Sequence, residues 1–210
     1  METEFIKVKD NYHLALKQAI TNLENGNIIA FPTDTVYGLG VNIDNIESIE
    51  KLYQIKNRPK NKPFAIYLYD YKQVSDYCEN IPDIFYQLAD EFLPGPLTII
   101  LRKKDYVLKN ISDDSRSLAV RIPNNKFMLD LIKINKSIIV GTSANHSGEK
   151  SAIDAMQILR DFKNKISLIL DGGTPKYSKE STVISLIDNK LEIIRNGALE
   201  KKLLEKVFYF

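Results

Sequence analysis

A short apolar run, Ile28–Phe31, is followed at once by Pro32 and then by a polar segment that contains glycine. Proline cannot donate a hydrogen bond to a sheet, so the run predicts a buried strand that ends at Phe31. The next eight residues, 33–40, hold two threonine hydroxyls, a carboxylate, a phenol and two glycines. Gly38 and Gly40 permit either a positive φ or a close approach of the backbone. Open α/β sheets bind ligands where a strand ends in such a turn, although a purely structural turn explains these residues nearly as well.

The remainder of the chain alternates apolar, strand-like runs with amphipathic helical segments, which is the order of elements in an α/β fold. A first helix is predicted over 11–25, beginning at Asp10 or Asn11, and a second begins at Asp44 and ends before Pro59. Further helices are predicted over 84–92, 125–134, 152–162 and 199–208. Further strands are predicted over 64–69, 97–101, 118–123, 138–140, 168–170, 180–184 and 191–197, with a polar loop over 103–116.

Composition is that of an ordinary globular protein. Of the 210 residues, 44% are hydrophobic and 27% are charged, which suits a single domain over residues 1–210. The net charge of +2 provides no whole-molecule basic field for nucleic acid. No apolar run approaches the ~20 residues of a membrane helix, and the acidic start of the chain does not indicate a signal peptide. We therefore expect a cytoplasmic protein without membrane contact.

Four cations lie close together in the segment that follows the second predicted helix: Lys56, Arg58, Lys60 and Lys62. Pro59 and Pro63 should keep this segment out of regular structure, on a fairly stiff loop. A solvated basic loop is the commoner outcome for such a run. The position of the loop between a helix and a strand also suits a clamp for phosphates.

Two other features point to a ligand site. Arg121 is a lone charge in an apolar strand, so it needs a partner or a ligand. Ser143 and Asn145 follow the strand at 138–140 in a turn bounded by glycines, where they can bind an anion or a sugar hydroxyl, or else cap the next helix. His146, in the same turn, is expected to face solvent.

The inventory of nucleophiles and metal ligands is poor. The chain has one cysteine, Cys78, and two histidines, His13 and His146, all far apart in sequence, so a zinc site of the usual nitrogen and sulfur ligands is not expected. Neither a Walker loop nor a dinucleotide-binding glycine motif is present. The cations, hydroxyls and amides at strand ends suit the positioning of phosphates, and they do not suit covalent catalysis.

Seven short motifs occur in order along the chain. They are Pro-Thr-Asp-Thr-Val-Tyr-Gly-Leu (32–39), Lys-Asn-Arg-Pro (56–59), Pro-Gly-Pro-Leu-Thr (94–98), Arg-Ile-Pro (121–123), Ser-Ala-Asn-His-Ser-Gly (143–148), Glu-Ser-Thr-Val (180–183) and Arg-Asn-Gly (195–197). Together they resemble the YrdC/TsaC family, the threonylcarbamoyl-AMP synthases, from about residue 12 to about residue 200. The chain is similar to the short, single-domain form of the family, without the C-terminal domain of the longer branch.

The resemblance implies a twisted mixed β-sheet flanked by helices, with a concave cationic active-site cavity. It also implies a nucleotidyltransferase. The amine of L-threonine takes up CO2 from bicarbonate, and the carbamate attacks the α-phosphate of ATP and expels pyrophosphate. The product, threonylcarbamoyl-AMP, serves the t6A modification of adenosine 37 in tRNA. Mg2+ is expected with ATP, and no metal site of the protein's own. The implied downstream partner is a threonylcarbamoyl-transferase complex of the TsaD/TsaB/TsaE type, and tRNA is a further candidate partner.

Residue by residue, the resemblance assigns two groups of contacts. Lys56 and Arg58 are the expected catalytic cations. Contacts to L-threonine are implied for Thr35, Tyr67, Arg121, Ser143 and Ser181. Contacts to ATP are implied for Lys56, Arg58, Lys62, Ser117, Asn145 and Arg195. Two positions depart from the family pattern: Tyr67 stands where a histidine is usual, and Ile153 stands where a threonine hydroxyl contacts the nucleotide.

Two other classes of function stay open from the sequence. One is a double-stranded RNA- or tRNA-binding module, because family members have a positively charged concavity. The net charge of +2 argues weakly against it. The other is the carbamoyl-transfer module of hydrogenase maturation proteins, which shares this fold. That module is expected together with acylphosphatase and zinc-finger segments, which this sequence does not contain.

Overall fold

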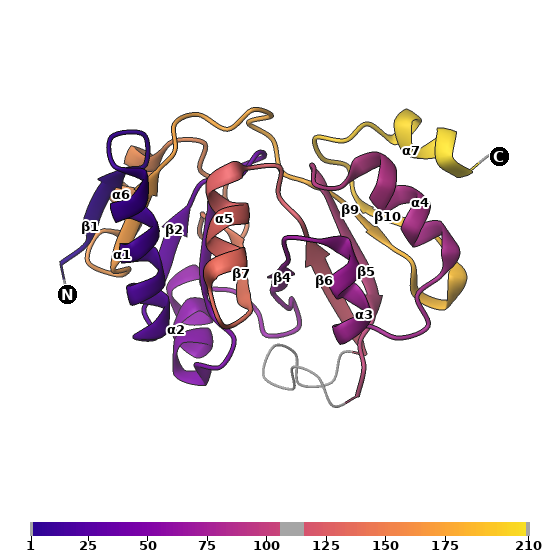
Figure 1. Cartoon of the computed structure of the whole chain (residues 1–210), viewed down its shortest axis with the longest axis horizontal. Coiled ribbons are helices and arrows are strands. Elements are labelled where there is room, and N and C mark those ends of the chain that lie inside the picture. Colours follow the sequence, from indigo (N-terminus) through magenta and orange to yellow (C-terminus); the bar gives the residue numbers. More distant parts are fainter. Residues whose placement is uncertain (1, 106–115, 209–210) are drawn as a thin grey trace.

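The computed structural model describes residues 2–105 and 116–208, and the strands of this part form one mixed sheet of ten (Figure 1). The spatial order is β1-β8-β2-β3-β7-β4-β6-β5-β9-β10. The strands are β1 Glu4–Lys7, β2 Ile29–Phe31, β3 Gly38–Asn42, β4 Ala65–Tyr67, β5 Leu97–Arg102, β6 Ser117–Arg121, β7 Ile139–Ser143, β8 Leu168–Asp171, β9 Thr182–Ser185 and β10 Glu192–Arg195. The expected twisted mixed sheet is confirmed.

Helices flank the sheet, as expected (Figure 1). They are α1 Tyr12–Glu24, α2 Ile46–Lys56, α3 Val74–Tyr77, α4 Asp83–Phe92, α5 Lys126–Ile134, α6 Ala155–Phe162 and α7 Lys201–Phe208. Side chains alternate across a strand, so neighbouring residues of β2 enter different cores. Phe31 packs in a cluster with residues of α1 and α5, whereas Ala30 packs in a larger cluster with residues of α2, α4 and α6.

The start of α2 corrects one expectation. Asn45, not Asp44, is the N-cap residue, and its side-chain oxygen accepts a hydrogen bond from the Ser48 backbone N–H at 3.0 Å. Asp44 accepts a hydrogen bond from the Ser137 hydroxyl instead. Asn11 caps α1, which was one of the two candidates for that position.

The polar segment after β2 contains a strand, β3, where the sequence predicts a turn. Gly38 and Gly40 lie in β3, which pairs antiparallel with both β2 and β7, and neither has a positive φ. Glycine is needed at both positions because the Phe31 ring packs closely against the backbone there. A Cβ atom on Gly38 would lie 2.4 Å from the Phe31 ring, and one on Gly40 would lie 2.8 Å from it. Residues 28–43 are all buried, so this segment forms the centre of the sheet.

Most of the polar loop expected over 103–116 lies outside the described residues. Within the described part of the chain, no helix is both long enough and apolar enough to cross a membrane.

Candidate active site

A cavity of about 270 Å³ lies over the middle of the sheet, and small residues on adjacent strands form its floor. In the strand register, Gly141 of β7 lies opposite Ala65 of β4, which in turn lies opposite Ala119 of β6. The next row contains Tyr67, Arg121 and Thr98, again as cross-strand neighbours. All six residues line the cavity. The hollow therefore follows from short side chains at matched register positions.

Arg121 is held at one wall of this cavity by Asp34. Its Nη2 donates to Asp34 Oδ1 at 2.7 Å and to Thr35 Oγ1 at 3.3 Å. Both charged side chains are buried, with 5% and 1% of their surface exposed. Arg121 Nη1 is also buried, and it has no hydrogen-bond partner among the described residues. The charge in the apolar strand thus has a protein partner, and it keeps one free donor.

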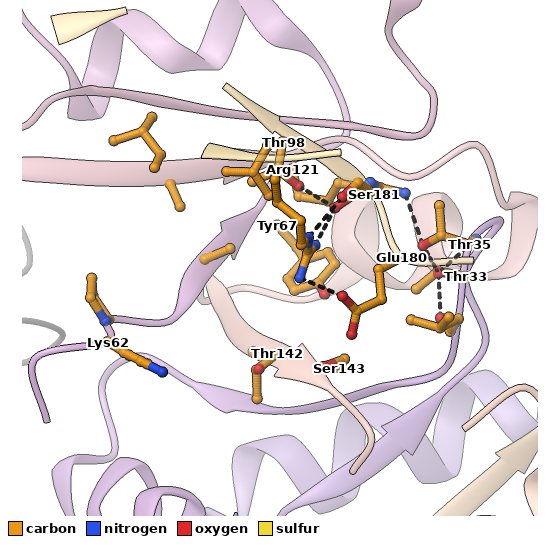
Figure 2. Close-up of a pocket in the computed structure, with 18 of the residues that line it drawn as sticks. Thr33, Thr35, Lys62, Tyr67, Thr98, Arg121, Thr142, Ser143, Glu180 and Ser181 are labelled. Atoms are coloured by element: carbon orange, nitrogen blue, oxygen red, sulfur yellow. Dashed lines mark hydrogen bonds and ion pairs between the residues drawn. The ribbon is translucent and has the colours of Figure 1, made fainter. Parts of the chain in front are cut away.

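Thr33 shapes the turn that brings Thr35 to Arg121. The Thr33 hydroxyl donates to the carbonyl of Val36 and accepts from the Thr35 backbone N–H at 3.1 Å. These local side-chain hydrogen bonds take the place of the β-sheet hydrogen bonds of β2, which end at Pro32. Both threonine hydroxyls line the cavity (Figure 2).

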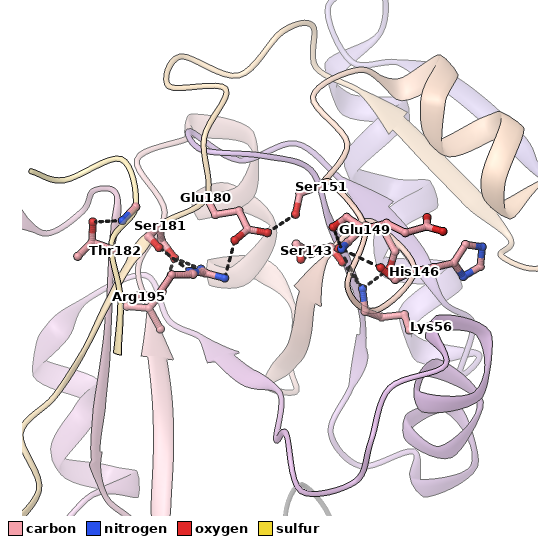
Figure 3. Close-up of polar contacts among 12 residues, drawn as sticks. Lys56, Ser143, His146, Glu149, Ser151, Glu180, Ser181, Thr182 and Arg195 are labelled. Atoms are coloured by element: carbon pink, nitrogen blue, oxygen red, sulfur yellow. Dashed lines mark hydrogen bonds and ion pairs between the residues drawn. The ribbon is translucent and has the colours of Figure 1, made fainter. Parts of the chain in front are cut away.

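Ser181, Arg195 and Glu180 form a second polar group on the cavity wall. Arg195 Nε donates to the Ser181 carbonyl at 3.0 Å, and its Nη2 donates to the Ser181 hydroxyl at 3.1 Å. Arg195 Nη1 lies 2.8 Å from Glu180 Oε2. The other Glu180 oxygen accepts from the Ser151 hydroxyl, as Figure 3 shows. The positive charge of Arg195 is therefore paired with the Glu180 carboxylate at the cavity wall.

Lys56 does not lie on the loop where the sequence predicts a clamp for phosphates. It is the last residue of α2, it is 1% exposed, and it does not belong to the lining of the cavity. Its ammonium group donates to the carbonyls of Ser143 and Asn145 and, at 3.3 Å, to Asn145 Oδ1 (Figure 3). Burial lowers the pKa of Lys56 to about 7, helped by nearby Arg58 and opposed by Glu180.

Ser143 and Asn145 form one network with Lys56. The Ser143 hydroxyl donates to Asn145 Oδ1 at 2.7 Å, and the Asn145 amide donates to the carbonyls of His146 and Glu149. Asp154 caps α6, so Ser143 and Asn145 do not take the helix-capping role.

The other cations of the basic segment behave differently from Lys56. Arg58 and Lys62 line the cavity, and Arg58 is braced by donating to the carbonyls of Lys62 at 2.7 Å and Pro63 at 3.1 Å. Burial is the main cause of a lowered pKa for Arg58, and nearby Arg195 adds to it. Lys60 is exposed and pairs with Glu50, as expected of a solvent-facing residue.

Tyr67 belongs to both the core and the cavity. Its ring packs edge-on against Phe31, with 5.3 Å between ring centroids, and 7% of the residue is exposed. Its hydroxyl makes no hydrogen bond within the described residues. Burial raises the pKa of Tyr67, and the cation of Arg121 opposes this.

Most of the predicted site residues meet at the cavity, and three do not. Those that line it are Thr35, Arg58, Lys62, Tyr67, Arg121, Ser143, Ser181 and Arg195. Lys56 and Asn145 form the buried network beneath Ser143. Ser117 is the first residue of β6, and it is not among the lining residues. The predicted contacts of all these residues with threonine or ATP stay predictions.

Two carboxylates and one histidine differ from what the sequence predicts. Asp34 and Glu180 stand inside the quoted motifs, but nothing in the sequence pairs them with Arg121 and Arg195. His146 does not simply face solvent: its ring packs on Phe162 at 4.8 Å, and its Nδ1 is buried without a hydrogen bond in the described structure. No group of three or more His, Cys, Asp or Glu residues suited to a metal ion occurs in residues 2–105 and 116–208.

Comparison with known proteins gives one consistent family. The family model Sua5_yciO_yrdC, described as telomere recombination, matches residues 21–197. A curated protein of Pyrococcus abyssi named threonylcarbamoyl-AMP synthase is 36% identical over 185 residues, which cover 88% of this chain and 54% of that protein. The chain thus spans about half the length of this relative.

Two solved structures extend the comparison to the fold. The crystal structure of P. abyssi Sua5 complexed with L-threonine is 35% identical with a TM-score of 0.88, and the match covers 92% of this chain and 57% of that one. Full-length HypF in its phosphate- and nucleotide-bound form is 27% identical with a TM-score of 0.75, and covers 87% of this chain and 29% of that one.

Proposed function

Because the chain belongs to the Sua5/YciO/YrdC family, we propose that it is an L-threonylcarbamoyladenylate synthase, a nucleotidyltransferase that uses L-threonine, bicarbonate and ATP. The P. abyssi relative carries the name of this activity, and P. abyssi Sua5 has been crystallised with L-threonine. The products are threonylcarbamoyl-AMP and pyrophosphate.

One observation carries the proposal. A single cavity combines a buried arginine that has a free donor, Arg121, with three further cations, Arg58, Lys62 and Arg195. A guanidinium with an unpaired N–H suits the carboxylate of an amino acid, and a group of cations suits a triphosphate. The hydroxyls of Thr35 and Ser181 lie on the same walls. An amino acid and a nucleotide can therefore meet in one hollow.

The chemistry needs positioning and charge, not a protein nucleophile. Threonine and bicarbonate condense to a carbamate with loss of water, and a carbamate oxygen then attacks the α-phosphorus. The bond from that phosphorus to the bridging oxygen breaks, and pyrophosphate leaves with the electron pair. Arg58 and Lys62 are the cations that we assign to this growing negative charge, which fixed charges stabilise in the transition state.

Magnesium enters this reaction as part of the substrate MgATP. Triphosphate oxygens are the ligands that Mg2+ prefers, and the protein then has no need of a metal-binding cluster of its own. We expect activity with Mg2+ as the only metal. A requirement for stoichiometric zinc after dialysis against a chelator would contradict this account.

The test is pyrophosphate release from MgATP with both L-threonine and bicarbonate present, and with each omitted in turn. We expect release to depend on both and the product to contain one threonine and one AMP. Arg121→Lys keeps a positive charge but loses the planar donor arrangement, so we expect most threonine affinity to be lost in a folded protein. Release that ignores threonine would overturn the proposal.

HypF was solved with phosphate and nucleotide bound, so the likeness to it supports a nucleotide site in this fold. The carbamoyl-transfer module considered from the sequence is therefore kept as a second candidate. The same assay separates the two. A carbamoyl-transfer module would accept carbamoyl phosphate in place of threonine and bicarbonate, whereas the synthase would not. The cytoplasmic location, the passage of product to a TsaD/TsaB/TsaE-type complex for t6A37, and contact with tRNA stay predictions.

A further inference from the structure

Asp34 and Arg121 form a buried ion pair between two distant parts of the chain. Asp34 lies in the turn between β2 and β3, and Arg121 ends β6 in the middle of the sheet. The Nη2 to Oδ1 distance is 2.7 Å, and both side chains are almost fully removed from solvent. The only other hydrogen bond to the Arg121 guanidinium within the described residues is the 3.3 Å contact of Nη2 with Thr35. Asp34 is thus the main group that fixes where the guanidinium lies.

Asp34 itself is held firmly in place. Its backbone carbonyl accepts a hydrogen bond from the Tyr177 N–H at 3.0 Å, which ties the turn to the segment before β9. The bonds made by the Thr33 hydroxyl fix the turn from within. Asp34 therefore provides a rigid anchor to which the longer arginine side chain is attached.

The pair is bonded through only one atom on each side. Asp34 Oδ2 and Arg121 Nη1 are both buried and without a partner among the described residues. A bidentate pair, the common arrangement for arginine and carboxylate, would use a second nitrogen and a second oxygen. Unpaired buried groups destabilise the folded protein, so this arrangement is poorly explained by stability alone. It leaves one donor, Nη1, without a protein partner in a residue that lines the cavity.

We propose that Asp34 is a positioning residue, which binds one amino group of Arg121 so that the other, Nη1, is kept for the carboxylate of an α-amino acid. The inference rests on the proposed function, because it supplies the substrate class. Without Asp34 the guanidinium keeps only the long contact to Thr35, and Nη1 is no longer held in one position.

The experiment compares Asp34→Ala and Asp34→Asn with the wild-type protein. The Michaelis constants for L-threonine and for MgATP are measured by pyrophosphate release, and binding of radiolabelled L-threonine is measured directly. We expect Asp34→Ala to raise KM for threonine at least about ten-fold, the scale of a lost charged hydrogen bond, with KM for MgATP changed by less than about two-fold. Asp34→Asn keeps an oxygen for Nη2, so it should lose less.

Three comparisons make the result decisive. Asp130→Asn makes the same chemical change in another ion-paired aspartate, on α5, and should alter neither constant. Adding Asp34→Ala to Arg121→Lys should raise KM for threonine little further, because both changes act on one contact. Circular dichroism identifies an unfolded variant, and if Asp34→Ala does not fold, Asp34→Asn decides.

Two different failures can be told apart. A wild-type protein that neither binds threonine nor releases pyrophosphate with it would overturn the proposed function, and the inference with it. An active wild type with an unchanged threonine KM in the folded Asp34 variants would overturn the positioning role alone. Equal rises in both Michaelis constants would also overturn it, because they indicate a general structural loss.

Discussion

Lys56 provides a prediction that does not depend on the proposed function. Its ammonium group is buried at the end of α2, where three oxygen atoms, all uncharged, accept its hydrogen bonds. No carboxylate lies within ion-pair distance of it in the described structure, and burial lowers its pKa from 10.5 to about 7. In the unfolded chain the group is solvated and keeps the ordinary value. Folding above neutral pH therefore releases a proton from Lys56.

The sign and size of the effect follow from this difference. Between about pH 7 and 10.5 the unfolded chain binds a proton that the folded chain has lost, so the free energy of unfolding rises with pH. The stabilisation is fully present above about 10.5 and is lost as the pH falls through about 7. One proton gives a slope of at most about 1.4 kcal/mol per pH unit. Near each pKa one of the two states is only partly protonated and the slope is smaller, so we expect an average of about 1 kcal/mol per unit over the range tested.

Lys56→Met tests this, because it keeps the length of the side chain and removes the titrating group. Urea unfolding at pH 7.5, 8.5 and 9.5 gives the difference in stability between wild type and variant, in which other titrations cancel. This difference should grow in favour of the wild type by about 2 kcal/mol over the range. The exposed neighbour Lys60, changed to Met, should follow the wild-type profile. Parallel profiles for wild type and Lys56→Met would refute the reasoning.

Three further predictions concern the cavity. Arg58→Ala should lower turnover in pyrophosphate release about a hundred-fold or more, as for other preorganised charges. Lys60→Ala, on the same segment, should change turnover very little. Equal effects of the two substitutions would indicate a solvated basic surface and favour RNA binding. Tyr67→Phe should raise KM for threonine with little change for MgATP, and an unchanged threonine KM would assign Tyr67 to the core alone. Ala119→Leu should fill the floor and abolish threonine binding, with thermal unfolding as the control for a folded protein; normal binding would exclude this floor as the substrate site.

Local patterns in the sequence predicted most elements of the sheet and its helices. Pro32 ends β2 at Phe31 because it cannot donate to a sheet, and the amphipathic run at 84–92 forms α4. Strand β3 was missed because Gly38 and Gly40 indicate a turn when read locally. Their actual role depends on the Phe31 ring of the neighbouring strand, which is a tertiary contact.

The site was predictable in its residue types and not in their pairing. The pattern around Arg121 required a partner or a ligand, but its partner, Asp34, is 87 positions away in sequence. For Lys56, closeness to Arg58 in sequence indicated a common loop, whereas the helix continues to residue 56 and turns this side chain inward. The predicted end of this helix, before Pro59, is confirmed, but sequence spacing could not report that Lys56 still belongs to the helix and points inward.

The positive charge of the cavity is unevenly neutralised, because only some of its cations are paired with carboxylates. Two of its cations, Arg121 and Arg195, are paired with carboxylates, whereas Arg58 and Lys62 have no carboxylate within ion-pair distance in the described part of the chain. Lys62 also stands apart from the group around Arg121 and Ser181 (Figure 2). Unneutralised positive charge is therefore concentrated toward the basic segment.

A ligand that carries most of its negative charge at one end should align with this field. Under the proposed function the triphosphate of ATP is such a ligand, and we expect its β- and γ-phosphates to lie toward Arg58 and Lys62. A single carboxylate is better matched to Arg121, where Asp34 already cancels much of the charge and one donor stays free. In this orientation we expect the α-phosphate to lie between the two ends, within reach of a carbamate formed on the amino acid.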